Sequence, residues 1–152
     1  MSSRSEAAPI EQLSVAAYRI PTDAPESDGT YEWDSTTIVI VDLAAGGKTG
    51  LGYTYADTAT AKLIEDLLKR VVLGRDAMSI QGCWDAMVHS IRNLGRPGIC
   101  SMAISAIDTA LWDLKARLLD LPLVRLFGQV REHLPIYGSG GFTSYEINKL
   151  RG

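Results

Sequence analysis

The chain is predicted to be an α+β protein, in which a three-stranded antiparallel sheet packs on a helical layer. Three runs suited to strands come first, Leu13–Pro21, Ser35–Ala44 and Thr49–Tyr55. From Asp57 onward, apolar residues recur instead at the three- and four-residue spacing of amphipathic helices. The chain has 152 residues, of which 46% are apolar and 22% are charged, so it is long enough to bury one core.

The strands are expected to follow one another as hairpins. Thr37–Leu43 is rich in β-branched residues, and its nearly continuous apolar character indicates burial on both faces over part of its length. Ala45–Lys48 is a turn, from which Thr49–Tyr55 returns. A long polar loop, Thr22–Asp34, is expected to join the first two strands. Residues 1–11 are polar and are expected to be frayed.

Three helices are expected after the strands. The first has Asp57 or Thr58 available as its N-cap and ends at Gly74. The second starts after Ser79, which can cap it. A break rich in glycine and proline follows, and the third helix begins near Ile99.

The segment Ala103–Gly128 reads AISAIDTALWDLKARLLDLPLVRLFG and has the most specific pattern of the sequence. Small residues within it allow another element to approach the helix closely. Asp108 and Asp113 lie about 140° apart around a helix, so they do not converge on one metal ion. These two acids are therefore expected to bond to backbone or basic groups.

This segment resembles the signature helix of the mandelate racemase / muconate lactonizing group in the enolase superfamily, and the resemblance covers nearly the whole chain. It implies that residues 1–128 are an enolase-like N-terminal capping domain. Residues 129–152 would then be the incomplete beginning of a TIM-like (β/α)7β barrel, with Leu134–Ser139 as its first strand. Ser144 is expected to cap a helix that starts at Tyr145.

The resemblance also implies a function. Enzymes of this group abstract the proton α to a carboxylate with a Lys or His base, and a bound Mg²⁺ ion stabilises the product of that step. The parent enzyme is expected to be an acid-sugar or hydroxy-acid dehydratase that binds a small-molecule carboxylate. A racemase, an epimerase or a cycloisomerase is the alternative.

The residues that carry this chemistry in the family are expected to be missing here. The family uses a Lys-x-Lys motif and three acidic magnesium ligands on later barrel strands. No Lys-x-Lys occurs in these 152 residues, and no acid-bearing strand run follows Gly141. No catalytic residue and no metal ligand is therefore expected in this chain, which looks like the front end of an enzyme. A non-catalytic, truncated capping module is the alternative from another class.

Substrate contacts are expected on two lid loops and at the first barrel strand. By the resemblance, Tyr31 and Trp33 lie on the first loop, Tyr53 on the second, and Ser139 at the end of that strand. Aromatic side chains on a lid exclude water and offer one polar tip. The structural alternative is that Trp33 and Tyr55 only cap the hairpin core, and that Ser139 belongs to a glycine turn.

Composition argues against several other classes. A net charge of −3 with scattered basic residues indicates no nucleic-acid partner. No apolar run is long enough for a bilayer, and no secretory signal is recognised. Cys83 and Cys100 are isolated, which fits a reducing cytoplasm, and His89 and His133 lack ligands at metal-binding spacing. The full-length protein is expected to form a homo-oligomer, as family members commonly do.

Overall fold

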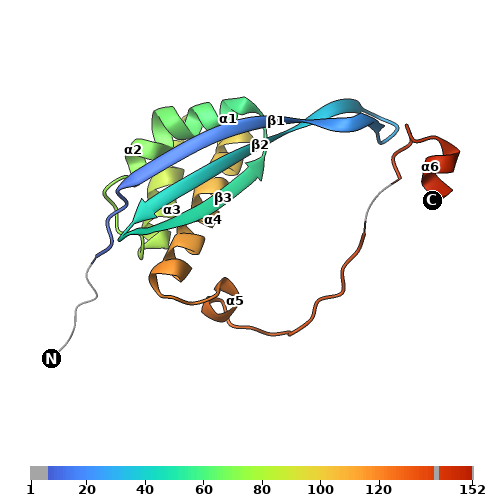
Figure 1. Cartoon of the computed structure of the whole chain (residues 1–152). Coiled ribbons are helices and arrows are strands. Elements are labelled where there is room, and N and C mark those ends of the chain that lie inside the picture. The colour runs from blue at the N-terminus through green and yellow to red at the C-terminus, as the bar shows by residue number, and fades with distance from the viewer. Residues whose placement is uncertain (1–6, 139–140, 152) are drawn as a thin grey trace.

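A three-stranded antiparallel sheet in the order β1-β2-β3 forms one layer of the molecule, and helices cover one of its faces (Figure 1). The computed structural model describes residues 7–138 and 141–151. The strands are β1 (Gln12–Ser27), β2 (Glu32–Ala45) and β3 (Lys48–Tyr55). The predicted α+β fold with a three-stranded sheet is confirmed.

The helical layer follows the sheet in the chain. Its elements are α1 (Thr58–Leu63), the π-helix η1 (Ile64–Leu68), α2 (Lys69–Val72), α3 (Ile80–Ser90) and α4 (Ile99–Leu118), and two short helices follow, α5 (Leu123–Leu126) and α6 (Ile147–Arg151). The predicted N-cap at Asp57 is confirmed, because its carboxylate accepts a hydrogen bond from the Ala59 amide at 2.8 Å. Gly74, with φ +76°, follows the end of this helical stretch, as expected.

The segment between the first two strands is not the expected loop. β1 and β2 keep pairing until Ser27 lies opposite Glu32, with one shift of register between Pro21 and Glu26. The polar composition of Thr22–Asp34 indicated a loop, but strand pairing depends on backbone groups that composition does not report. The irregularity also accommodates Pro21, which has no amide hydrogen to donate. Residues 22–34 therefore form a projecting hairpin that extends beyond the sheet (Figure 1).

Asp28 organises the tip of the projecting hairpin. Its carboxylate accepts bonds from the Thr30 amide at 2.8 Å, the Thr30 hydroxyl at 2.7 Å and the Tyr31 amide at 3.0 Å. The Thr30 hydroxyl, followed by these two amides, lowers the pKa of Asp28. Gly29 adopts φ +90° in the same turn, a conformation that glycine allows at little cost.

The core lies between the sheet and α4, and two glycines of β3 make the approach close. A Cβ on Gly52 would overlap the Ala106 carbonyl oxygen and lie 2.6 Å from the Ala110 nitrogen. A Cβ on Gly50 would lie 2.5 Å from the backbone nitrogen of Leu114. The small residues of α4 therefore allow close packing, as the sequence predicted. Fully buried side chains of this core include Val39, Val41, Leu43, Ile107, Leu111 and Leu114.

Residues 8–11, which were expected to be frayed, contact the body of the domain. Ile10 is only 2% exposed. Its amide donates to the Arg75 carbonyl at 2.8 Å, and the Gly74 amide donates to the Ile10 carbonyl at 2.9 Å. One apolar side chain in a polar stretch is therefore enough to anchor this segment.

Two expectations for the C-terminal residues are wrong. Leu134–Ser139 is not a strand over the part that the structure describes, and Ile136 is 94% exposed. Within the described ranges no strand lies beside it to exchange hydrogen bonds, so an apolar pattern alone does not form a ladder. The last helix, α6, starts at Ile147 and not at Tyr145. Ser144 does not cap it, because its hydroxyl donates to the Pro25 carbonyl at 2.6 Å.

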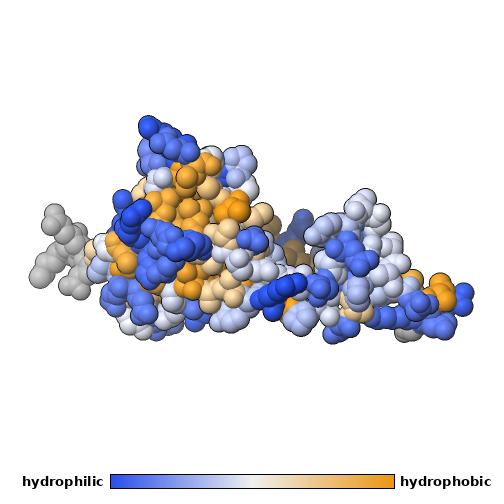
Figure 2. Space-filling view, turned by 90° about the horizontal axis from the view of Figure 1, so that it is seen from above, coloured by the Kyte–Doolittle hydropathy of each residue, from blue (hydrophilic) through white to orange (hydrophobic). Residues whose placement is uncertain are grey.

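Apolar side chains gather over the body of the domain, whereas mainly polar groups cover the projecting hairpin (Figure 2). None of the helices within residues 7–138 and 141–151 is long and apolar enough to cross a membrane. Cys83 is buried, and burial raises the pKa of its thiol.

Candidate functional site

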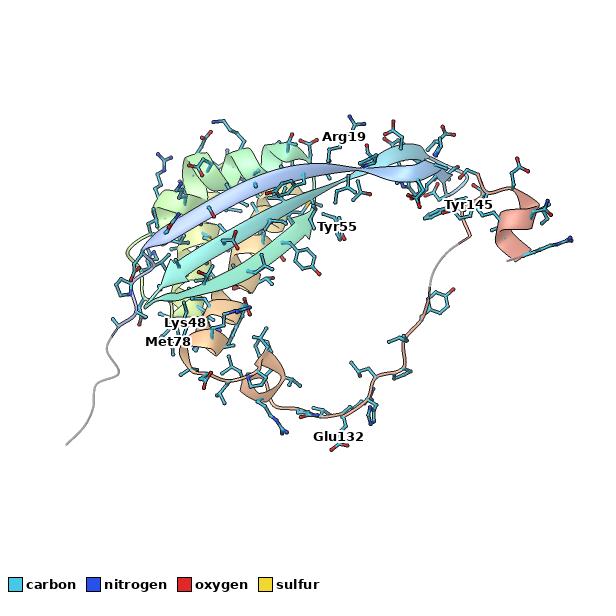
Figure 3. All side chains as sticks on the ribbon, viewed as in Figure 1. Arg19, Lys48, Tyr55, Met78, Glu132 and Tyr145 are labelled. Atoms are coloured by element: carbon cyan, nitrogen blue, oxygen red, sulfur yellow. The ribbon has the colours of Figure 1, made fainter. Side chains whose placement is uncertain are left out.

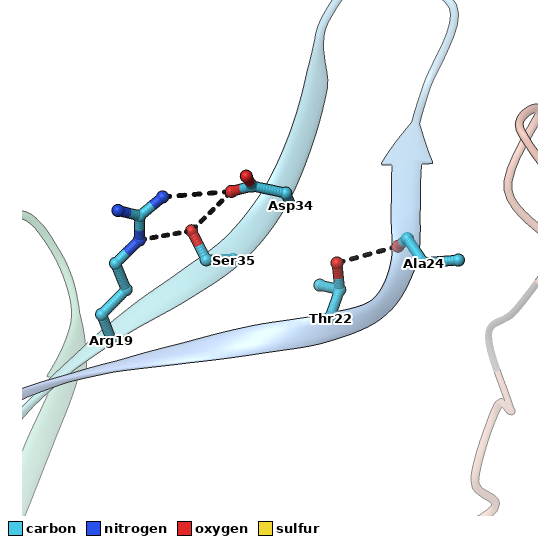
Figure 4. Close-up of polar contacts among 5 residues, drawn as sticks. All are labelled: Arg19, Thr22, Ala24, Asp34 and Ser35. Carbon is cyan, nitrogen blue, oxygen red and sulfur yellow. Dashed lines mark hydrogen bonds and ion pairs between the residues drawn. The ribbon is translucent and has the colours of Figure 1, made fainter.

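The base of the projecting hairpin is braced by three polar side chains (Figure 4). The Arg19 Nε donates to the Ser35 hydroxyl at 2.7 Å, and an Arg19 terminal nitrogen donates to Asp34 at 3.1 Å. The Ser35 hydroxyl donates to the same Asp34 oxygen at 2.8 Å. This hydroxyl first, and then Arg19, lowers the pKa of Asp34. The network holds an ionised carboxylate and an oriented hydroxyl at the foot of the hairpin.

A hollow of about 480 Å³ lies where this hairpin meets the end of β3. It is lined by Tyr31, Trp33, Ser35, Thr36, Thr37, Tyr55, Ala56 and Asp57, and we call it the tyrosine hollow. Tyr31 is 70% exposed and Tyr55 is 62% exposed, so both phenols are accessible there. Figure 3 shows Tyr55 at the end of the sheet from which the hairpin projects. The fold thus brings together two segments that are separate in the sequence.

Trp33 is fixed at the centre of the projecting hairpin. Its indole Nε1 donates to a Glu26 carboxylate oxygen at 2.8 Å. Its ring stacks on Tyr31 with centroids 6.3 Å apart and planes 15° apart. The same indole also borders a second hollow of about 420 Å³, on the flank that carries Arg19 and Asp34. Trp33, Tyr31 and Ser35 therefore border both hollows.

Tyr53 lies next to the tyrosine hollow without lining it. Its ring meets that of Tyr55 edge-on, with centroids 6.2 Å apart and planes at 83°. Both rings project from the same face of β3, because side chains two apart in a strand share a face. Tyr55 had been interpreted at most as a cap of the hairpin core, and the two-residue repeat of tyrosines could have identified it. Ser139 lies outside the described residues.

The lining of the tyrosine hollow is suited to a polyol. Two phenols and the hydroxyls of two threonines can each donate and accept hydrogen bonds, whereas the Ser35 hydroxyl already donates to Asp34 and accepts from Arg19. The aromatic faces of Tyr31, Trp33 and Tyr55 can exclude water from the groups that they cover. Asp57 supplies the carboxylate among the lining side chains, and it already accepts the Ala59 amide.

The described residues do not fit a magnesium ion. Residues 7–138 and 141–151 contain no group of three or more His, Cys, Asp or Glu side chains placed to hold a metal. Asp113 instead accepts the Leu51 amide at 2.8 Å and the Arg117 Nε at 2.9 Å, which confirms its structural interpretation. His89 and His133 are exposed.

Asp108 faces a smaller hollow between α3 and α4, of about 230 Å³. The Arg96 guanidinium lies 4.9 Å from the centre of the Trp84 ring in the same hollow. Burial raises the pKa of Asp108, and a hydrogen bond with Trp112 partly opposes this effect. This hollow shares no lining residue with the tyrosine hollow.

Comparison with known proteins identifies the domain. A family model described as "Mandelate racemase / muconate lactonizing enzyme, N-terminal domain" matches residues 11–128. The chain belongs to this family. The domain is therefore an enolase-superfamily capping domain, as the signature segment in α4 predicted.

Similar proteins of this family include both known enzymes and solved structures. A 3,6-anhydro-alpha-L-galactonate cycloisomerase from Streptomyces coelicolor is 37% identical over 139 residues, which cover 86% of this chain. An L-talarate/galactarate dehydratase from Salmonella typhimurium is 31% identical and matches 93% of this chain. The crystal structure of a mandelate racemase/muconate lactonizing enzyme-like protein from Rubrobacter xylanophilus has a TM-score of 0.90 and 52% identity over 94% of this chain.

All three similar proteins are much longer than the match. The chain spans 38% of the cycloisomerase and 38% of the dehydratase. It spans 40% of the Rubrobacter chain. The resemblance therefore concerns the N-terminal part of these proteins.

Proposed function

We propose that this chain is the N-terminal part of a magnesium-dependent enzyme that dehydrates an acid sugar or a related hydroxy acid. The overall reaction removes the proton α to a carboxylate and expels the neighbouring hydroxyl group as water. The capping domain would select the substrate. The observation that carries this proposal is the tyrosine hollow, in which the projecting hairpin and the end of β3 present hydroxyl groups to one space.

The residues of this chain would bind the substrate and exclude water rather than move the proton. Tyr31 and Tyr55 offer exposed phenols that can hydrogen-bond to hydroxyl groups of the sugar chain. Trp33 would close the site with its ring, while Tyr53 would support Tyr55. Ser139 is expected, from the family resemblance, to contact the substrate from the segment that follows the capping domain.

The relatives support an acid-sugar substrate. Besides the talarate/galactarate dehydratase, they include an arabinonate dehydratase from Saccharolobus solfataricus, 34% identical over 77% of this chain. Several related structures hold magnesium, among them the Salmonella dehydratase with L-lyxarohydroxamate. A cycloisomerase is the second candidate, because the Streptomyces cycloisomerase is 37% identical whereas the talarate/galactarate dehydratase is 31% identical. We further expect the whole protein to be a cytoplasmic homo-oligomer.

The experiment that tests this proposal uses the protein expressed from the whole reading frame that encodes this chain. It is incubated with Mg²⁺ and a panel of aldonates and aldarates, and loss of water is followed as formation of a 2-keto-3-deoxy acid. We expect magnesium-dependent product from at least one acid sugar. The 152-residue chain alone, as the control, should neither bind Mg²⁺ specifically nor exchange an α-proton in deuterated water.

Two other outcomes of this experiment would support a different function. Isomerisation of a substrate without loss of water would support the cycloisomerase or racemase instead. No reaction with any carboxylate would overturn the enzyme proposal and favour a non-catalytic capping module.

A further inference from the structure

The segment 141–146 lies against the projecting hairpin, although more than a hundred positions separate them in the sequence (Figure 1). The Thr143 amide donates to the Ser27 carbonyl at 3.1 Å, and the Thr143 hydroxyl donates to the same oxygen at 2.7 Å. The Ser144 hydroxyl donates to the Pro25 carbonyl at 2.6 Å. Three hydrogen bonds therefore join this segment to the irregular part of the hairpin.

Aromatic rings extend the same contact. Phe142 meets Trp33 edge-on, with centroids 5.6 Å apart and planes at 88°. Tyr145 packs edge-on against Phe142, with centroids 5.4 Å apart, and Figure 3 shows it beside the hairpin tip. Such T-shaped pairs are favourable beyond the area that they bury. Together with the stacked Tyr31, the rings form one continuous cluster across the two segments.

The contact acts on Trp33, which borders both hollows of the hairpin together with Tyr31 and Ser35. Within the hairpin, Glu26 accepts from the nitrogen end of the Trp33 indole and Tyr31 stacks on its face. Phe142 adds an edge-on contact from outside the hairpin, which joins the indole to the segment 141–146. Gly141 adopts φ +84° just before it, a backbone conformation that turns the chain and that side-chain-bearing residues rarely adopt.

We propose that the segment 141–146 is a latch that holds the projecting hairpin in one orientation, with Phe142 as a positioning residue that acts through Trp33. The latch itself is a property of the fold. Its consequence for substrate selection rests on the proposed function, because the hairpin would be the lid over the acid sugar. The latch thereby connects the lid to the C-terminal segment of this chain.

The test on this chain measures hydrogen exchange at the Thr143 amide together with near-ultraviolet circular dichroism. Phe142→Ala should accelerate exchange at Thr143 about tenfold or more and reduce the tryptophan signal. Phe142→Tyr should restore both, because the ring is kept. Phe127→Ala is the matched control for exchange at Thr143, since Phe127 packs on Trp112, with centroids 4.7 Å apart, outside the latch.

Two further variants distinguish loss of the latch from a general loss of folding. Thr143→Val removes only the hydroxyl and should also accelerate exchange at that amide, while exchange at Leu51, which is bonded to Asp113, stays unchanged. In a Trp33→Phe background, Phe142→Ala should cause no further loss of tryptophan signal. The latch is overturned if neither Phe142→Ala nor Thr143→Val changes exchange at Thr143 more than Phe127→Ala does.

The consequence for the lid is read in the protein expressed from the whole reading frame. There, Phe142→Ala should raise KM for the acid sugar several-fold with little change in kcat, and Phe142→Tyr should restore it. Slow exchange at Thr143 in a protein without acid-sugar turnover would uphold the latch and reject only the proposed function. Turnover combined with exchange that Phe142→Ala leaves unchanged would reject only the latch.

Discussion

Asp113 is the residue that most directly ties the signature helix to the sheet. Its carboxylate accepts the Leu51 amide of β3, whereas its ion pair with Arg117 is largely exposed on the arginine side and contributes little. Asp113→Ala should lower the free energy of unfolding by about 0.5–1.5 kcal/mol, because the exposed Leu51 amide exchanges this acceptor for water. Asp113→Asn should lose less, since its amide oxygen can still accept. Equal losses in denaturant unfolding of the two variants would contradict this role.

Asp108 should make stability depend on pH in the opposite way to a paired carboxylate. Burial raises its pKa above the usual 3.8, so the folded state binds this proton more tightly than the unfolded state. Stability therefore falls as pH rises from 3.8 through the folded pKa, and stays lower above it.

Asp108→Asn removes this ionisation. The variant should be more stable than the unchanged chain at pH 7, and the difference should shrink as pH falls through the folded pKa towards 3.8. Urea unfolding at pH 7 and at acid pH checks both statements. A gain that is the same at both pH values would show that ionisation of Asp108 is not its cause.

At the scale of the elements, the contact between β3 and α4 depends on glycine. Gly52→Ala should destabilise the domain by about 1–3 kcal/mol, because the new methyl group overlaps the backbone of α4 at Ala106 and Ala110. Gly138→Ala is the matched control, since a Cβ there would meet nothing within 4 Å. Thermal unfolding of both variants measures the difference. Equal stability of the two would contradict the close contact.

Elements whose pattern is local could be predicted from the sequence. The cap at Asp57 and the helix end at Gly74 depend on residues that are near in the sequence. The small residues of α4 depend on one face of a single helix. The projecting hairpin could not be predicted, because its pairing across Pro21 depends on a partner strand and an irregular register. The π-helix η1 within the first helical stretch gave no recognisable signal either.

The candidate site could be predicted only in part, because some of its contacts join segments that are distant in the sequence. Tyr31 and Trp33 were singled out through the family resemblance, and the fold places them beside Tyr55. The role of Phe142 could not be predicted, because its contact with Trp33 joins two segments that lie far apart in the sequence. Whether Tyr31, Trp33, Tyr53 and Ser139 touch a substrate stays a prediction.

At the scale of the whole molecule, the core and the C-terminal residues differ sharply in the exposure of their apolar side chains. The buried core residues all precede Gly128, whereas Val130 is 91% exposed and Ile136 is 94% exposed. A chain that ends at Gly128 should remain folded and be more soluble, because an unpaired apolar segment promotes association. Light scattering at rising concentration, together with a thermal melt, measures both properties. Lower solubility or loss of the cooperative melt would contradict the domain boundary at residue 128.

The central claim is that the tyrosine hollow is the surface that selects the substrate. The most direct test measures kcat/KM for an acid sugar in the protein expressed from the whole reading frame, with Tyr31→Phe, Tyr55→Phe and Tyr18→Phe compared. Tyr18 is the control, because it is 53% exposed on β1 and does not line the hollow. Loss of one substrate hydrogen bond should lower kcat/KM about 3- to 10-fold in the first two variants and leave the control unchanged. Unchanged kcat/KM in both hollow variants, or an equal fall in all three, would contradict the account.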